Sequence, residues 1–221
     1  DLQEAIARLL RKRLDGFLFD RIILETTGMA DPAPIIQSLV LDKTSSPKVI
    51  LDRVLVTVDS MTGLTSLTEF EEASRQVALA DILLITKTDL LTDDTVNLKR
   101  ELKAINEEAK IFTSNLGQID LALVLDKRDN WTNNYVSKSE DEHFHSHSNI
   151  SSVSLYFKKP IHAVTLTLFL EVLAETLGSN LIRIKGLVFI KEAKETPAIV
   201  HGVQHVFHAI SWHESWPERR E

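Results

Sequence analysis

The chain has 221 residues, of which 43% are hydrophobic and 26% are charged, and its formal net charge is −7. This acidic balance argues against a nucleic-acid or anionic-membrane partner held by bulk electrostatics. No apolar run approaches the length of a membrane span, so we expect a soluble, cytoplasmic protein of one large or two small domains.

The first two predicted elements are a helix and a strand. Apolar residues recur at helical spacing from Leu2 to Leu10, and Asp15-Gly16 is a typical helix stop. The apolar run over 17–24 then predicts a strand that is buried on both faces, as in a parallel sheet.

That predicted strand ends in Glu25-Thr26-Thr27-Gly28, and ligands of open α/β sheets bind beyond the carboxyl ends of the strands. The carboxylate of Glu25 is a hard oxygen ligand suited to a hydrated Mg²⁺. Gly28 has no Cβ, so its backbone N–H can approach a terminal phosphate. A strand followed by a Gly-Pro turn explains the same residues equally well.

The next predicted elements are a short helix and a strand. Pro32 and Pro34 set a loop or a first helical turn before a helix over 35–41. A β-branched strand over 48–59 ends in Asp59. We interpret this carboxylate as a cap on the following helix rather than as part of a ligand site.

A helix over 69–80 leads into a second fully apolar strand over 82–85, which ends in Thr86-Lys87-Thr88-Asp89. P-loop GTPases recognise guanine with such a Thr/Asn-Lys-x-Asp tetrad. A carboxylate such as Asp89 accepts hydrogen bonds from guanine N1–H and the exocyclic amine together, whereas adenine has no matching donors. The stem of Lys87 would lie flat over the base. The alternative is structural, because Lys and Asp after a strand also cap helices.

A helix from Thr92-Asp93-Asp94 to about Glu108 and a short strand over 111–114 complete the first half of the chain. Backbone N–H groups at the tip of that strand, at Ser114, would extend the guanine pocket, although a plain loop fits as well. The alternation of strands and helices through residue 125 predicts a parallel α/β sheet.

Residues 127–150 are polar and aperiodic, which predicts a linker. His143, His145 and His147 stand at alternate positions beside three carboxylates, and together these groups can supply nitrogen and oxygen ligands to Zn²⁺, Ni²⁺ or Co²⁺. We expect a weak, exchangeable site. The alternative is a solvated acidic linker whose histidines bind nothing.

A second unit is predicted from residue 151, with a strand, a helix and two further strands at 153–157, 164–177, 181–190 and 198–210. On a single strand His201 and His205 share one face and His208 points to the other. We therefore interpret these three histidines as surface or packed residues rather than as metal ligands.

Two segments resemble a known family: Glu-Thr-Thr-Gly-Met-Ala-Asp-Pro-Ala-Pro at 25–34 and Ala-Asp-Ile-Leu-Leu-Ile-Thr-Lys-Thr-Asp-Leu at 80–90. They resemble the CobW family of GTP-dependent metallochaperones, which is related to the nickel-insertion GTPases of urease and hydrogenase maturation. The resemblance implies a P-loop-type GTPase domain with a parallel sheet over 1–126, a His-containing acidic linker over 127–150 and a small α+β domain over 151–221.

Two departures from the family accompany the resemblance. The guanine motif begins with Thr86 where the commonest form has Asn. No two of the seven glycines stand five positions apart, as a Gly-x4-Gly-Lys-Ser/Thr P-loop requires, and the chain has no cysteine for the Cys-x-Cys-Cys motif of CobW-like proteins. The resemblance therefore implies an N-terminally truncated piece, which we expect to bind GTP poorly and to hydrolyse it negligibly by itself.

The resemblance also implies roles for the candidate residues. Glu25 would hold the Mg²⁺ shell and Gly28 would sense the γ-phosphate of GTP. Selection of guanine would fall to Thr86, Lys87 and Asp89, with Ser114. The linker histidines would relay a transition metal, first of all Zn²⁺, to a client protein: His143, His145 and His147. The alternative function is a non-catalytic metal-binding or protein-docking module.

Overall fold

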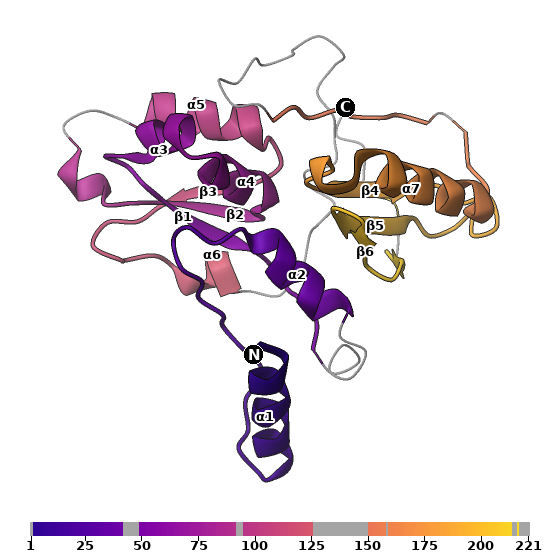
Figure 1. Cartoon of the computed structure of the whole chain (residues 1–221), viewed down its shortest axis with the longest axis horizontal. Helices are drawn as coiled ribbons and strands as arrows, with labels where there is room; N and C mark the ends of the chain where they lie inside the picture. The colour runs from indigo at the N-terminus through magenta and orange to yellow at the C-terminus, as the bar shows by residue number, and fades with distance from the viewer. Residues whose placement is uncertain are drawn as a thin grey trace.

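The computed structural model describes residues 2–41, 49–91, 95–125, 150–157, 159–213 and 216. Two sheets organise these residues, a parallel sheet in the first half of the chain and an antiparallel sheet in the second (Figure 1). The predicted parallel α/β fold followed by a smaller α+β unit is thereby confirmed. The predicted linker at 127–150, with its three histidines, lies outside the described residues except for Ile150.

The parallel sheet has the strand order β1 (Leu55–Asp59), β2 (Ile82–Thr86) and β3 (Lys110–Thr113). Strand β2 lies in the middle and has neighbours on both edges, which explains why its sequence is a continuous apolar run. In the register, Asp59 is opposite Thr86. The carboxyl ends of β1 and β2 therefore stop side by side at one edge of the sheet.

Helices α3 (Gly63–Glu69), α4 (Glu71–Leu79) and α5 (Val96–Ile105) lie on one side of this sheet, and α6 (Leu121–Leu125) lies on the other (Figure 1). The helix predicted over 69–80 is confirmed as α4, and the helix after the tetrad is confirmed as α5. Helix α3 was not predicted from the sequence. The core of this half is formed by buried residues from β1, β2, α4 and α5: Val58, Val77, Leu83, Ile85, Leu98, Leu102 and Ile105.

The strand predicted over 17–24 is wrong. This segment has no regular secondary structure and pairs with no strand of the described chain, and the side chains of Leu18 and Ile23 are 85% and 78% exposed. A strand is stable only when a neighbour accepts its backbone hydrogen bonds, and an apolar sequence alone does not supply that neighbour. The strand predicted over 48–59 is likewise shorter, because only β1 pairs.

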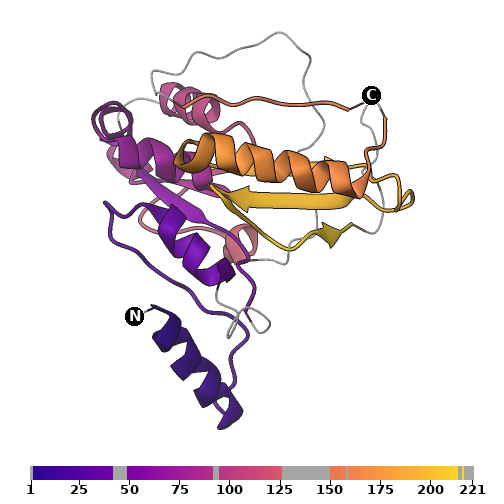
Figure 2. The same cartoon turned by 45° about the vertical axis from the view of Figure 1, so that its right-hand side comes forward.

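The segment 17–31 connects two confirmed helices, α1 (Leu2–Leu14) and α2 (Pro32–Leu41). Helix α1 projects away from the other elements in both views (Figures 1 and 2), and Ile6 is its buried residue. Helix α2 instead lies against both halves of the described chain. Its buried residues Ala33 and Ile36 pack with Leu79 of α4 and Val203 of the second sheet.

The antiparallel sheet consists of β4 (Ile184–Val188), β5 (Ala198–Val203), β6 (Val206–Phe207) and β7 (Ser211–Trp212). Helix α7 (Ala163–Leu177) lies across this sheet (Figure 2), and its residues Leu166 and Leu170 are buried against the sheet. Gly178 follows α7 with φ of +52°, a conformation that residues with a Cβ rarely adopt. The helix predicted over 164–177 is confirmed as α7.

Of the strands predicted in this half, one is absent and one is interrupted. Residues 153–157 form no strand, and the chain first pairs at Ile161, which bridges Ile190. The strand predicted over 198–210 is interrupted by a tight turn at Gln204, whose φ is +53°, between β5 and β6.

The turn at Gln204 also overturns the prediction that His208 points away from His201. Because the chain reverses, the two imidazole rings stack with centroids 4.6 Å apart and planes 4° apart. The backbone N–H of His208 donates to the carbonyl of His201 at 2.9 Å. A single continuous strand would have placed these rings on opposite faces.

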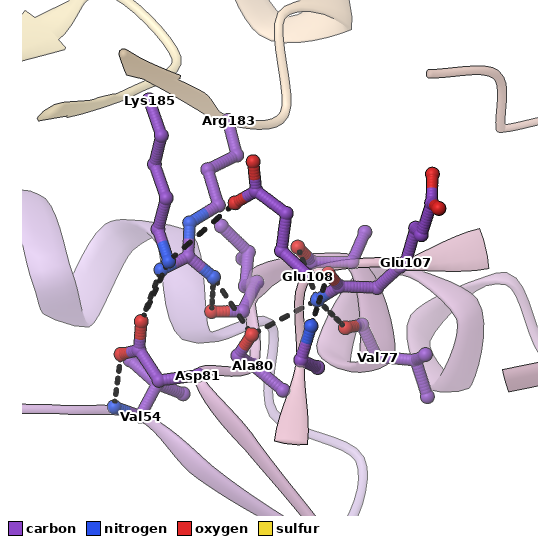
Figure 3. Close-up of polar contacts among 12 residues, drawn as sticks. Val54, Val77, Ala80, Asp81, Glu107, Glu108, Arg183 and Lys185 are labelled. Carbon is purple, nitrogen blue, oxygen red and sulfur yellow. Dashed lines mark hydrogen bonds and ion pairs between the residues drawn. The ribbon is translucent and has the colours of Figure 1, made fainter. Parts of the chain in front are cut away.

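A cluster of charges joins the two halves at Asp81, the residue before β2 (Figure 3). Its carboxylate accepts hydrogen bonds from Arg183, from the ammonium of Lys185 at 2.9 Å and from the backbone N–H of Val54 at 2.8 Å. Burial raises the pKa of the Asp81 carboxyl, but the charges of Arg183 and Lys185 outweigh burial and hold that pKa well below its ordinary value.

Arg183 extends this cluster to the end of α4. Its guanidinium donates to the carbonyls of Leu79 and Ala80 at 2.6 and 2.8 Å. The last carbonyls of a helix have no partner within the helix. Asn106 supplies a further donor there, with its side-chain amide 2.8 Å from the carbonyl of Val77 and 2.9 Å from that of Ala80.

Replacing Asp81 by Asn is expected to lower the free energy of unfolding by about 3 kcal/mol, because two partly buried cations lose their shared carboxylate. Urea unfolding measures this loss. The matched control is Glu71→Gln, which breaks the exposed Arg75–Glu71 pair at 2.7 Å and is expected to cost less than about 1 kcal/mol. Equal losses in the two variants would contradict a structural role for the Asp81 cluster.

His201 is expected to make the stability pH-dependent. Burial, followed by the charges of Arg183 and His208, lowers the pKa of His201 to about 3. An unfolded histidine titrates at about 6.5, so the unfolded chain binds more protons below that pH and stability falls as the pH falls. His201→Gln should flatten the decline in melting temperature between pH 7 and 5, whereas the exposed His205→Gln should not. An unchanged slope in His201→Gln would refute this assignment.

Candidate functional site

Four of the residues predicted to select guanine gather at the carboxyl edge of the parallel sheet. Thr86 ends β2, Lys87 and Asp89 follow it, and Ser114 follows β3. They gather because the three strands run parallel and stop at the same edge. This arrangement agrees with the general position of ligand sites in open α/β sheets.

Lys87 has an unusual backbone conformation that the end of β1 stabilises. Its φ is +57°, in the left-handed region, which costs a residue with a Cβ about 1–2 kcal/mol. The hydroxyl of Ser60 donates to the Lys87 carbonyl at 2.9 Å, and the backbone N–H of Ser60 donates to the Thr86 carbonyl at 3.0 Å. The ammonium of Lys87 lies 2.6 Å from Oδ2 of Asp59.

Asp59 holds the turn that leads to Thr62, the N-cap residue of α3, rather than capping the helix itself as predicted, and it also pairs with Lys87. Its Oδ1 accepts the backbone N–H of Met61 at 2.8 Å and that of Thr62 at 3.4 Å. The hydrogen bond from Lys87, followed by those from the backbone, lowers the pKa of the Asp59 carboxyl despite partial burial. This pair could not be predicted from the sequence, because it depends on the register of β1 and β2, which places Asp59 beside the tetrad.

The second half of the tetrad is held from the side of β3. The hydroxyl of Thr88 donates to the Ser114 carbonyl at 3.1 Å, and the backbone N–H of Leu116 donates to Oδ1 of Asp89 at 3.3 Å. The backbone N–H of Ser114 donates to the carbonyl of Ile85 at 2.7 Å. The N–H of Ser114 is therefore used in a hydrogen bond to β2 rather than in the predicted guanine pocket. The loop after Ser114 contacts Asp89 through the N–H of Leu116.

Glu25 and Gly28 lie in the segment outside the sheet, so the strand that was predicted to end at Glu25 is not observed. Glu25 is exposed and forms no hydrogen bond or ion pair with another described residue. The carbonyls of Gly28 and Ala30 accept hydrogen bonds from the side chain of Gln76 on α4, at 3.0 and 2.9 Å. Gln76 gave no signal in the sequence beyond its place in the predicted helix.

The ranges that the structure describes contain no group of three or more His, Cys, Asp or Glu side chains that could hold a metal ion. The proposed metal ligands His143, His145 and His147 lie outside these ranges. Within the same ranges, every helix is too short or too polar to cross a membrane.

Comparison with known proteins gives matches over both halves of the chain. Residues 1–113 match the CobW/HypB/UreG nucleotide-binding domain, and residues 150–221 match the cobalamin synthesis protein cobW C-terminal domain. The chain belongs to the CobW family.

Two relatives of this CobW-family chain carry functional names. The zinc chaperone YjiA of Escherichia coli is 30% identical over 224 residues, which cover 100% of this chain and 70% of the relative. The zinc-regulated GTPase metalloprotein activator 1 of Schizosaccharomyces pombe is 30% identical over 119 residues, which cover 53% of this chain and 28% of the relative.

Solved structures extend the match to three dimensions. The Zn(II)-bound YjiA GTPase from E. coli superposes with a TM-score of 0.79 at 29% identity, covering 100% of this CobW-family chain and 70% of that chain. A Zn(II)-bound triple mutant of the same GTPase gives 0.78 at 30% identity, covering 98% and 68%. The parallel sheet and the C-terminal antiparallel sheet therefore have counterparts in a known GTPase.

Proposed function

We propose that the protein carrying this chain binds and hydrolyses GTP and delivers a transition metal to a client protein. The observation that carries the proposal is the sheet edge where Thr86, Lys87 and Asp89 are fixed by contacts from both neighbouring strands. Zn²⁺ is the first candidate for the metal, because the two named relatives are a zinc chaperone and a zinc-regulated GTPase. Co²⁺ and Ni²⁺ are the alternatives, because the same imidazole and carboxylate groups bind them.

The chemistry of this edge fits guanine. Asp89 offers a carboxylate to the N1–H and exocyclic amine of the base, an arrangement of charge-assisted hydrogen bonds that adenine cannot form. The Lys87 stem, held at its ammonium by Asp59, offers an apolar surface to the face of the base. Thr86 donates its hydroxyl to the Val58 carbonyl at 3.4 Å, so it contributes to holding the strand ends together.

Hydrolysis of GTP depends on positioning the β- and γ-phosphates and neutralising their charge. In this proposal Gly28 contacts the γ-phosphate through its backbone N–H, and Glu25 binds the hydrated Mg²⁺ that neutralises the phosphates. A single carboxylate on an exposed segment suits Mg²⁺, which keeps several of its waters.

Helix α2 offers a route from nucleotide state to the C-terminal unit. The loop at Gly28 runs into α2, whose first turn is capped by Asp31 through a hydrogen bond from the N–H of Ala33 at 2.8 Å. Further along α2, Gln37 donates to the side-chain oxygen of Gln204 at 2.6 Å. A rearrangement of the loop would therefore reach the turn between β5 and β6 directly.

A non-catalytic metal-binding or docking module is the second candidate. The observation that favours it is the position of Glu25 on a segment that belongs to neither sheet. Under this alternative the tetrad would be a structural junction between β2 and the loop after β3, without selection of guanine.

Replacing Asp89 by Ala in the full-length gene product is expected to weaken binding of a fluorescent guanine nucleotide about 100-fold, because two charge-assisted hydrogen bonds are lost. Asp120→Ala is the matched control. It removes the same charge and a similar backbone contact, the hydrogen bond from the N–H of Ala122 at 2.9 Å, but leaves the tetrad intact.

Two outcomes of this titration would favour the docking module. One is a wild-type protein that shows no preference for guanine over adenine nucleotides. The other is an affinity for guanine nucleotide that Asp89→Ala leaves unchanged.

Zn²⁺ binding by the 221-residue chain is expected to depend on its linker histidines. A triple Ala variant at His143, His145 and His147 should raise the apparent Kd in calorimetry by at least about tenfold, because three imidazole ligands are removed. A triple Ala variant at His162, His205 and His213 controls for the loss of three histidines elsewhere. Identical isotherms for the wild type and the linker variant would contradict a role of the linker histidines in binding the transition metal.

A further inference from the structure

We propose that Asp59 and Ser60, at the end of β1, are positioning residues of the guanine site that hold Lys87 ready to receive the base. The inference rests on the proposed guanine-nucleotide function. It concerns the residues beside the tetrad rather than the tetrad itself, and it assigns Asp59 a role beyond capping the turn before α3.

Asp59 and Ser60 make two contacts with the tetrad residue Lys87 and a third with Thr86, the residue before it. The carboxylate of Asp59 binds the ammonium at 2.6 Å, the hydroxyl of Ser60 binds the carbonyl at 2.9 Å, and the N–H of Ser60 binds the preceding carbonyl, that of Thr86, at 3.0 Å. A left-handed backbone at a residue with a Cβ persists only where its surroundings stabilise it. The dipeptide Asp59-Ser60 supplies those surroundings.

The two strands that flank β2 contact different residues of the tetrad. The end of β1 contacts Thr86 and Lys87, whereas the chain after β3 contacts Thr88 and Asp89. Asp89 is therefore positioned from the β3 side to bind the edge of the base. Lys87 is positioned from the β1 side.

The anchored ammonium determines the course of the lysine stem. The Cα of Lys87 follows β2 and its Nζ is held by Asp59 of β1, so the stem crosses from the end of one strand to the end of the next along the edge of the sheet. A stem fixed at both ends presents an extended apolar surface to the base. Binding then needs less ordering of a flexible side chain than it would for a lysine in solvent.

A simple surface ion pair is the competing explanation, because the Lys87 side chain is 59% exposed and such pairs add little to stability. The same exposure makes the inference testable, because breaking the pair leaves the fold intact. Asp59→Asn is the informative variant. It retains an oxygen for the N–H groups of Met61 and Thr62 but loses the charge that anchors Lys87.

The experiment is a double-mutant cycle in the full-length gene product, with fluorescent GDP as the probe. We expect Asp59→Asn to weaken GDP binding about 3- to 10-fold through the lost ordering of the lysine stem. We expect the same substitution to have no effect in a Lys87→Met background, because that background has no ammonium to anchor. The preference for guanine over adenine nucleotides should not change, since Asp89 sets it. Ser60→Ala should also weaken GDP binding, and the exposed-pair control Glu71→Gln should not.

The possible outcomes distinguish a failure of the positioning role of Asp59 from a failure of the proposed guanine-nucleotide function. A loss of affinity that persists in Lys87→Met would mean that Asp59 acts only through the turn before α3, which overturns the inference. Normal GDP binding by Asp59→Asn would overturn it as well, and both results leave the guanine site standing. A wild-type protein without guanine preference would remove the proposed function, and the inference with it.

Discussion

The carboxylate of Asp81 lies where three strands and a second folding unit meet. Its side chain binds the cations of Arg183 and Lys185 from the C-terminal half and the backbone of Val54 before β1. Its own backbone carbonyl accepts the N–H of Lys110 at the start of β3, at 3.1 Å. A side chain only 14% exposed holds two cations and is ionised because of them. This cluster is one of the contacts that join the two halves of the described chain, together with helix α2.

Strand β2 connects that cluster to the candidate nucleotide site. It begins next to Asp81 and ends at Thr86, so one buried strand has the junction between the halves at its start and the tetrad proposed to bind guanine at its end. Its apolar residues Leu83 and Ile85 are fully buried. Because close-packed interiors are not easily deformed, a buried strand of this kind keeps the residues at its two ends at a fixed separation. Helix α2 provides a second connection, from the Gly28 loop to the C-terminal sheet.

The site combines a rigid part with a less constrained part. The tetrad is fixed by β1 and by the chain after β3, and its residues were found from their order after an apolar run. Glu25 and Gly28 were found in the same way, but the strand expected before them is absent, because no described neighbour pairs with 17–24. Asp59, Ser60 and Gln76 were missed as partners of these residues. Their contacts span 27 to 48 residues of sequence, and no local pattern reports them.

By itself, the sequence predicted the alternation of helices and strands around the parallel sheet, the Thr86-Lys87-Thr88-Asp89 tetrad after a buried strand and the resemblance to the CobW family. The alternation and the tetrad rest on local spacing, which can be recognised within a single segment. The family resemblance rests on the two motifs at 25–34 and 80–90. Only the tertiary structure decided which apolar runs become strands, that a turn stacks His208 on His201, and that Asp81 joins the two halves. Strand pairing and the shared charges each require a partner distant in sequence, and the stacked histidines require a turn at Gln204; each of these is defined only when the chain has folded.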